Sequence, residues 1–222
     1  GLSRMADAVD TATRILYPGE IRHQENRAFR TVLELEAEQI DAAEDLAEDV
    51  VLVDHNVPRG FQGSSDVNPV AVVDHHPGDG AGQSFTDVRP EYGACATIVV
   101  EYLEGRGFDL TGEADDKSLS AAEATGLLYG ILSDTNHLTR GPTAAEFAAA
   151  AALYPGVDEG LLDRIANPEV DAEVLDVTAR AIENREVRAP FVVSAVGEVS
   201  NVDAIPQAAE ELLQLEGTTA VV

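Results

Sequence analysis

The sequence predicts an α/β fold: a mostly parallel sheet flanked by helices, followed by the start of a second, smaller α/β domain. Two nearly continuous apolar runs, at residues 50–53 and 70–73, are typical of parallel strands that are covered on both faces. Long helical patterns follow these runs, and from Pro190 on the pattern becomes strand-like again. We therefore expect a first domain over residues 1–187 and the beginning of a second over residues 188–222.

The part of the chain before the two apolar runs alternates between helical and extended patterns. Its apolar spacing predicts, in order, a helix at residues 2–16, a helical stretch at 24–29, a strand at 31–35 and an acidic linker at 41–48. Strands at residues 50–54 and 70–74 follow. The link between them is polar and rich in Gly and Ser, so a parallel pair would need an irregular connection in place of a crossover helix.

The rest of the chain is mainly helical until its last segment. Apolar stripes bounded by Gly, Pro or Ser predict helices at residues 93–103, 118–132, 143–153, 159–165 and 172–186. Ser118 and Ser120 are candidate N-caps for the second of these helices. The last segment reads as a βαβ unit, with its elements at residues 191–196, 205–213 and 218–222.

The composition describes a folded domain with an acidic surface. The formal charge is −27 and the pI about 4.2, yet 45% of the residues are hydrophobic, which is too apolar for a disordered acidic tail. Acidic residues spread along the whole chain favour a halophilic protein, kept soluble in a high-salt cytoplasm, over an ordinary acidic one. Such a charge repels nucleic acid at low salt, but at molar salt the Debye length falls to about 3 Å and the repulsion is screened.

Other features of the composition narrow the compartment and the partners. A single cysteine, Cys95, excludes a disulfide framework within the chain. The absence of a signal-peptide pattern and of an apolar stretch of about 18 residues predicts a cytoplasmic protein with no membrane partner. The Ala-rich stretch at residues 144–153 would suit a homodimer, although a buried core explains it equally well.

Aspartate and histidine follow the ends of predicted elements at three places. Asp54 and His55 follow the first apolar run, Asp74, His75 and His76 follow the second, and residues 133–137 (Ser-Asp-Thr-Asn-His) close a helix. The carboxyl edge of an open α/β sheet is where ligands bind, and carboxylates with neutral imidazoles suit Mn²⁺ and similar ions. One such group alone is better explained as a helix cap with local hydrogen bonds, but three in one chain favour a metal site.

These motifs resemble those of the DHH superfamily of phosphoesterases. Val-Val-Asp74-His75-His76-Pro is similar to the signature motif, Leu-Val-Asp54-His55-Asn56 to the motif before it, and Gly130-Ile-Leu-Ser-Asp134-Thr to the motif after it. Residues 92–97 (Tyr-Gly-Ala-Cys-Ala-Thr) resemble the helix start that follows the signature. The resemblance covers about residues 20–190 and includes RecJ-type exonucleases, NrnA-type oligoribonucleases and manganese-dependent family II inorganic pyrophosphatases. Together with the acidic composition, the resemblance points to a haloarchaeal member of the superfamily.

The resemblance implies a role for each matching residue. Asp54 would bridge two Mn²⁺ ions, with Mg²⁺ or Co²⁺ as alternatives, while His75 would bind one ion and Asp134 would complete the ligand set. His76 would face the scissile phosphate, and Asp74 would support the histidine pair, because ligating imidazoles need a fixed tautomer. Residues beside these positions are candidates for substrate binding: His55, Asn136, His137, Arg140 and Thr97.

The chain departs from the family pattern in two ways. No motif with a His and two Asp residues precedes Asp54, and no Gly-rich segment with a His appears near the end, so we expect flanking sequence to be missing and this piece to be inactive alone. The implied activity is hydrolysis of phosphodiester or phosphomonoester bonds in short oligonucleotides or nucleotides. Pyrophosphate hydrolysis is an alternative, less attractive with 14 basic residues. A regulatory nucleotide-sensing module without catalysis is another.

Overall fold

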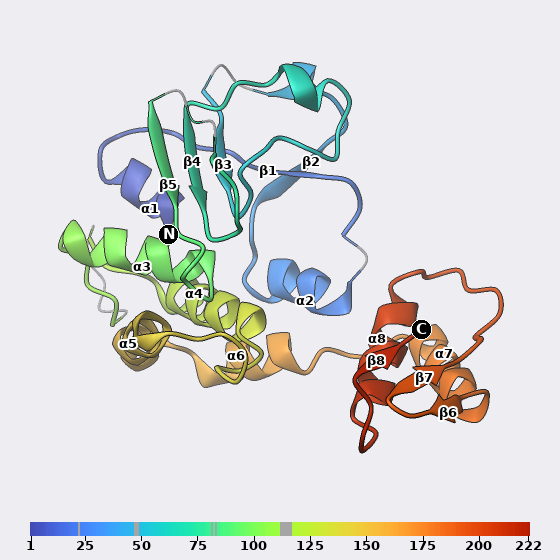
Figure 1. Cartoon of the computed structure of the whole chain (residues 1–222). Coiled ribbons are helices and arrows are strands. Elements are labelled where there is room, and N and C mark those ends of the chain that lie inside the picture. Colours follow the sequence, from blue (N-terminus) through green and yellow to red (C-terminus); the bar gives the residue numbers. More distant parts are fainter. Residues whose placement is uncertain (22, 47–48, 81, 83, 112–116) are drawn as a thin grey trace. The chain divides into compact units, whose positions relative to one another are not determined.

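The computed structural model describes residues 1–21, 23–46, 49–80, 82, 84–111 and 117–222 (Figure 1). Its contacts divide the chain into two compact units. The first unit comprises Gly1–Glu20 and Ala28–Ala166, and the second comprises Ile21–Arg27 and Asn167–Val222. The domain boundary predicted after residue 187 falls within the second unit, because the helix before it packs against the helix that follows it.

The strands of the first unit form two parallel sheets. Strand β1 (Ile15–Pro18) pairs with β2 (Ala37–Ile40), and β3 (Val51–Val53), β4 (Ala71–Asp74) and β5 (Phe85–Val88) form the other sheet in the order β3-β4-β5. The link between β3 and β4 contains only a short 3-10 turn, η2 (Ser64–Asp66), among its described elements. The predicted parallel pair with an irregular connection is confirmed, and the carboxyl ends of β3 and β4 therefore lie side by side.

A layer of helices packs beneath this sheet in Figure 1. It contains α3 (Cys95–Gly105), α4 (Ala121–Asp134), α5 (Ala144–Leu153), η3 (Tyr154–Gly156) and α6 (Glu159–Ala166). Cys95 and Ile98 of α3 pack against Val73 of β4, while α4 packs against α3, α5 and α6. The Ser120 hydroxyl accepts a hydrogen bond from the backbone of Glu123, whose carboxylate accepts one in return, so α4 begins at a capping box. The predicted α/β architecture is confirmed.

Several boundaries differ from those predicted. Helix α1 (Leu2–Asp7) is much shorter than residues 2–16, because Asp10 is left-handed (φ +55°) and Ile15–Pro18 pairs with β2 as a strand. The strand predicted at residues 31–35 was wrong, because helix α2 (Gln24–Val32) extends into it. The backbone of Glu34 is left-handed after this helix, and strand β2 begins only at Ala37.

The acidic linker and one strand of the first unit also differ from the expectation. The linker contains a 3-10 turn, η1 (Ala43–Asp45), and its residues 47–48 lie outside the described part of the chain. Strand β5 had no prediction, because Phe85-Thr-Asp-Val lacks the apolar run that marks β3 and β4.

The second unit is a small α/β assembly. Helix α7 (Ala172–Glu183) packs against α8 (Ala204–Leu213), and the sheet contains β6 (Glu186–Arg188), β7 (Phe191–Val193) and β8 (Ala220–Val221). Strand β7 is parallel to β8 with α8 between them in the chain, which confirms the predicted βαβ unit; β6 adds an antiparallel strand that was not predicted. Its buried core includes Val177, Val192 and Leu212.

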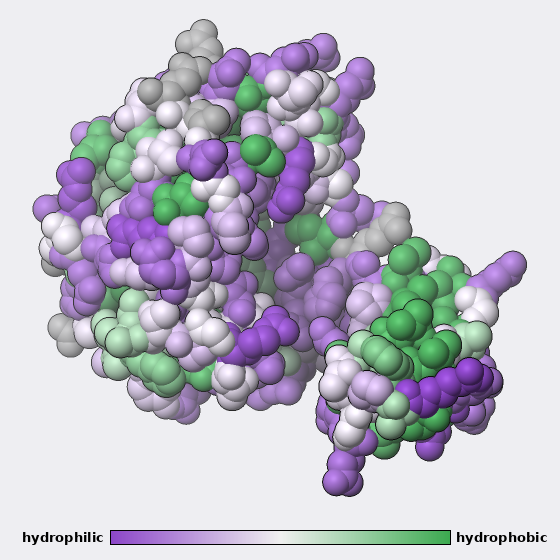
Figure 2. All heavy atoms as spheres, in the orientation of Figure 1, coloured by the Kyte–Doolittle hydropathy of each residue, from purple (hydrophilic) through white to green (hydrophobic). Residues whose placement is uncertain are grey.

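Hydrophilic residues cover much of the face of the first unit that is seen in Figure 2, as the acidic composition predicts. Apolar residues gather on the face of the second unit that is seen in Figure 2. The exposed large apolar residues of this unit include Val187 and Phe191 of its sheet. Within the part of the chain that the structure describes, none of the helices combines the length and hydrophobicity needed to cross a bilayer.

Candidate metal centre

Three predicted ligands lie at the ends of neighbouring elements of the first unit. Asp54 directly follows β3, His75 directly follows β4, and Asp134 is the last residue of α4. The backbone N–H of Asp54 donates to the carbonyl of Val73 (2.9 Å), which extends the ladder to this residue. Asp54 itself has a left-handed backbone (φ +65°), which is uncommon outside glycine. The chain therefore turns away from the sheet at this residue.

The side chains at these ends converge. His75 Nε2 lies 3.4 Å from Asp54 Oδ1 and 3.9 Å from Asp134 Oδ2. Donor atoms of Asp54, His75 and His76 all lie within 4.8 Å of one another, as they would around a metal ion. We call Asp54, His75, His76 and Asp134 the Asp–His cluster. The structure therefore brings together the ligands that the sequence predicts from three separate segments.

The orientation of His75 is set by a backbone carbonyl. Its Nδ1 lies 3.2 Å from the carbonyl oxygen of Tyr92, which can only accept a hydrogen bond. Nδ1 therefore carries the proton in the neutral ring, and the lone pair of Nε2 faces the carboxylates of Asp54 and Asp134. This is the arrangement of a metal-ligating histidine, whose other ring nitrogen donates to a fixed acceptor.

Asp74 holds both histidines by hydrogen bonds. It is fully buried, and its Oδ1 accepts hydrogen bonds from the backbone N–H of His75 (2.8 Å) and of His76 (3.1 Å) and from His76 Nδ1 (2.8 Å). Burial raises the pKa of Asp74, but the hydrogen bonds from His76 and His75 outweigh it and leave the pKa below its usual value. The same hydrogen bond from its ring raises the pKa of His76 and leaves Nε2 as its free nitrogen, on a side chain that is 53% exposed.

The carboxylates of the cluster lack comparable support. Burial raises the pKa of Asp54, opposed by the neighbouring histidines. Burial and the charge of Asp54 together raise the pKa of Asp134 to about 6. Burial, with the charge of Asp54, raises the pKa of the nearby Cys95 thiol to about 12, so this cysteine is not a nucleophile. Negative charge is therefore concentrated and only partly compensated at this place, and a bound cation would reverse these pKa shifts.

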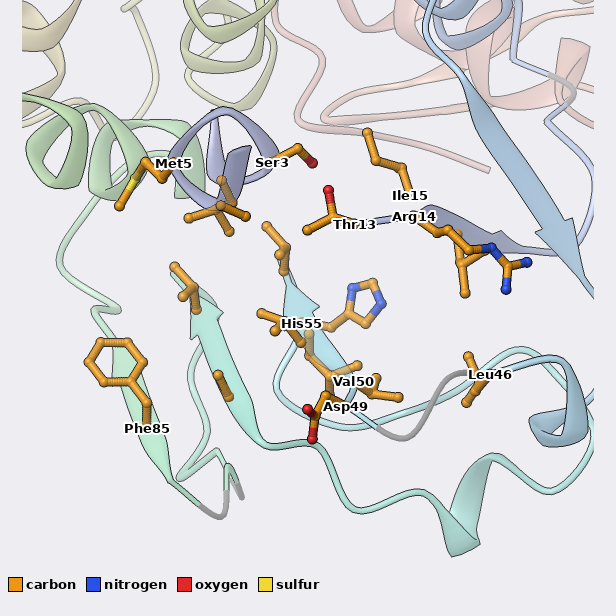
Figure 3. Close-up of a pocket in the computed structure, with 18 of the residues that line it drawn as sticks. Ser3, Met5, Thr13, Arg14, Ile15, Leu46, Asp49, Val50, His55 and Phe85 are labelled. Atoms are coloured by element: carbon orange, nitrogen blue, oxygen red, sulfur yellow. The ribbon is translucent and has the colours of Figure 1, made fainter. Parts of the chain in front are cut away.

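His55 lies apart from the cluster. It lines a cavity of about 1400 Å³ in the first unit, between the two sheets and α1, and Figure 3 shows it among the other lining residues, which include Arg14, Ile15 and Val50. The walls of this cavity are mainly apolar, and no member of the Asp–His cluster is among its lining residues. The substrate-binding role of His55 stays a prediction; the charge of its ring acts on the neighbouring Asp54, whose pKa it lowers slightly against the effect of burial.

The segment after Asp134 is a left-handed turn. Asn136, His137 and Leu138 have φ values of +45°, +55° and +61°, and the N–H of Leu138 donates to the Thr135 hydroxyl (3.1 Å). A run of left-handed residues is costly for side chains with a Cβ, and such strain is concentrated at functional sites. The turn leaves Asn136 and His137 exposed next to the cluster, where the predicted substrate contact remains open to them.

Two further predicted substrate contacts differ in exposure. Arg140 is exposed, and its contact with a substrate stays a prediction. Thr97 is fully buried within α3, and the contact of its hydroxyl with a phosphate likewise stays a prediction. The sequence reasoning missed Tyr92 as a determinant of the site, because its backbone carbonyl acts and no residue type signals that.

Comparisons of the sequence find longer relatives. The chain is 34% identical over 218 residues to an uncharacterized protein of Methanocaldococcus jannaschii, MJ1633, covering 97% of this chain and 44% of that protein. It is 30% identical over 152 residues to an A-adding tRNA nucleotidyltransferase of Aquifex aeolicus, covering 68% of this chain and 15% of that protein. The chain therefore spans less than half the length of these relatives. No family model matches it.

Comparisons of the structure find the predicted architecture. An exopolyphosphatase-related protein from Bacteroides fragilis matches with a TM-score of 0.69 at 13% identity, covering 98% of this chain and 68% of that one. A Methanococcus jannaschii protein assigned provisionally to the family II inorganic pyrophosphatases matches with a TM-score of 0.58 at 20% identity, covering 98% and 75%. At these identities the likeness establishes the fold alone, an α/β architecture that the chain shares with these two proteins.

Proposed function

We propose that this chain carries the metal-binding part of a phosphoesterase that depends on divalent cations, with two Mn²⁺ ions as the first candidate. One observation carries the proposal: His75 Nε2 lies 3.4 and 3.9 Å from carboxylate oxygens of Asp54 and Asp134, and in the neutral ring oriented by the Tyr92 carbonyl this nitrogen offers them a lone pair. With the ring neutral and both carboxylates ionised, such a set repels itself unless a cation lies within it.

In this proposal some residues would bind the metal ions and others would position the side chains around them. Asp54, His75 and Asp134 would hold the ions, and when bound these would neutralise phosphoryl oxygens and lower the pKa of water. Through its Oδ1, Asp74 fixes the ring of His76 and the backbone N–H of His75, while the Tyr92 carbonyl orients the ring of His75. Asp74 accepts the Nδ1–H of His76 and raises the pKa of this ring, and the imidazolium form would donate from its exposed Nε2 to a phosphoryl or leaving oxygen.

We propose short oligonucleotides or nucleotides as the substrates. The similarity to segments of A-adding tRNA nucleotidyltransferases supports a substrate related to nucleic acid. Pyrophosphate is the second candidate, supported by the provisional family II pyrophosphatase among the structural neighbours. Against it, a small, highly charged anion needs several free basic residues, whereas Arg14 and Arg89 are already paired with carboxylates.

The test is an assay of the protein in its longest native form with Mn²⁺ against a dinucleotide, phosphoadenosine phosphate and pyrophosphate. Asp54→Ala should remove activity because it removes the carboxylate shared by the site, whereas Asp176→Ala, a change of an exposed aspartate in the second unit, should not. Preference for pyrophosphate would select the second candidate. Binding of a nucleotide without turnover by the wild type would favour the regulatory module, and retention of more than about a tenth of wild-type turnover in Asp54→Ala would contradict the assignment.

A further inference from the structure

A second charged group of the first unit lies between the end of β5 and helix α3. Arg89 stands at its centre: Nε and Nη2 donate to the two carboxylate oxygens of Asp87 (2.8 and 2.7 Å), and Nη1 donates to Glu101 Oε2. The Tyr92 hydroxyl donates to Glu101 Oε1 (2.6 Å), and the Tyr102 hydroxyl donates to Asp87. We call these five residues the Arg89 network. Each of its four carboxylate oxygens accepts a hydrogen bond.

The two tyrosine rings also pack on the guanidinium. The Arg89 Cζ lies 5.2 Å from the ring centroid of Tyr92 and 6.0 Å from that of Tyr102, within the range of cation–π attraction. The network is half-buried, with the side chain of Arg89 24% exposed and that of Asp87 19% exposed. A bidentate, partly desolvated pair between two aromatic rings has a defined geometry, unlike a surface ion pair.

The network is joined to the Asp–His cluster by the backbone. The N–H of Arg89 donates to the carbonyl of Asp74 (2.9 Å), and the N–H of Tyr92 donates to the carbonyl of Arg89 (3.0 Å), closing a turn. The carbonyl of Tyr92 then accepts from His75 Nδ1 (3.2 Å). Tyr92 is therefore held by its side chain on Arg89 and Glu101, while its carbonyl holds His75.

We propose that Arg89 is a positioning residue for His75. By holding the ring and hydroxyl of Tyr92, it fixes the carbonyl that keeps the proton on His75 Nδ1 and turns Nε2 toward Asp54 and Asp134. The effect on metal binding rests on the proposed function, whereas the effect on the imidazole does not. Outer partners of this kind typically change metal affinity by about 10–100-fold when they are lost.

The experiment compares Arg89→Met with Arg188→Met in the full chain. Arg188 also pairs with a carboxylate, that of Glu186, but it is exposed in the second unit, so its loss controls for removing a positive charge. Ring ¹⁵N shifts of His75 in metal-free protein read the tautomer, and titration with Mn²⁺ reads the affinity. We expect a mixture of tautomers and an affinity about 10–100-fold weaker in Arg89→Met only.

Two milder variants keep the test decisive if Arg89→Met does not fold. Arg89→Lys keeps the charge but loses the bidentate geometry, and Tyr92→Phe keeps the carbonyl but loses the hydroxyl that donates to Glu101. Each should shift the His75 ring signals toward a mixture of tautomers, in proportion to its loss of Mn²⁺ affinity. Folded variants that keep a single Nδ1–H tautomer and bind Mn²⁺ within twofold of wild type would overturn the proposal. A wild type that binds no Mn²⁺ would count against the proposed function, while the ring signals would still decide the role of Arg89.

Discussion

The Asp–His cluster and the Arg89 network use the same kinds of side chain in opposite ways. In the Arg89 network each carboxylate oxygen accepts a hydrogen bond, and the pKa values of Asp87 and Glu101 lie below their usual range because those hydrogen bonds outweigh burial. In the Asp–His cluster the carboxylates face one another and a histidine lone pair. The pKa values of Asp54 and Asp134 are raised there.

This difference indicates that the carboxylates of the Arg89 network stabilise the fold, whereas those of the Asp–His cluster are available for a ligand. The side chains of Asp54 and Asp134 are 50% and 33% exposed, so water can solvate them, but their pKa values are raised and they lie together around one histidine nitrogen, a combination that is typical of functional sites. The two regions lie on either side of the same turn at residues 89–92, so a general shortage of basic residues in the chain does not account for the contrast. Substitutions in each region should have different effects, and the predictions below test that.

The largest effect is expected from Asp54→Asn. The amide keeps the size of the side chain but loses the negative charge shared by the site, so Mn²⁺ affinity should fall by more than the roughly 10–100-fold expected for an outer partner. Calorimetric titration of the full chain measures it, with the exposed Asp176→Asn as control. An affinity within threefold of wild type would remove Asp54 from the ligand set and with it the contrast between the regions.

The next effect is the dependence of Mn²⁺ affinity on pH. The cation must displace the proton from Asp134, whose pKa is raised to about 6 by burial and by Asp54. Affinity should therefore be level above pH 7 and fall by up to about tenfold per unit once the pH drops below 6. Titrations from pH 5 to 7.5 measure it, and Asp134→Asn should lose this part of the dependence. A profile that is flat down to pH 5 would mean that Asp134 does not bind the ion.

Much of the site could be predicted from the sequence, because its residues directly follow strong local signals. Asp54 and His75 follow apolar runs that fix two parallel strands, and parallel pairing alone brings their ends together. Asp134 ends a helix whose apolar stripe and candidate N-cap, Ser120, are both visible in the sequence. The convergence of the three side chains follows from these placements.

The missed features depend on tertiary contacts. Strand β1 was predicted as helix because Ile15 and Leu16 continue a helical spacing, and only pairing with β2 makes them extended. Strand β5 has Asp87 within it, which breaks the apolar pattern, and that aspartate is acceptable there because Arg89 pairs with it. The burial of Thr97 and the role of the Tyr92 carbonyl likewise depend on neighbours distant in the chain.

A smaller effect, on stability, is expected from Asp87→Asn. The substitution leaves Arg89 half-buried with one carboxylate partner fewer, which should lower the free energy of unfolding by about 1–3 kcal/mol at pH 7. The pKa of Asp87 is lowered in the folded state, so its contribution is present above the unfolded value of 3.8 and is lost as the pH falls through the folded pKa. Urea unfolding at pH 7 and at pH 3 measures both. An equal loss at the two pH values would contradict a role for the charge.

The smallest effect, and one of opposite sign, is expected from Asp134→Asn in metal-free protein. The pKa of Asp134 is raised in the folded state, so its ionised form disfavours folding once the pH exceeds the unfolded value of 3.8, and the full penalty applies above about 6. At pH 7.5 the neutral amide should raise the free energy of unfolding by on the order of 1 kcal/mol, after allowance for solvent screening, or about 2–4 °C in Tm.

Saturating Mn²⁺ should then invert the order of the two proteins. Wild type gains stability from an ion that binds only the folded state, whereas the Asp134→Asn variant gains little. Thermal unfolding with and without Mn²⁺ measures both halves of the comparison. A carboxylate kept for a cation should make the metal-free wild type less stable than the Asp134→Asn variant. If the variant is instead the less stable of the two without metal, Asp134 supports the fold, as the carboxylates of the Arg89 network do.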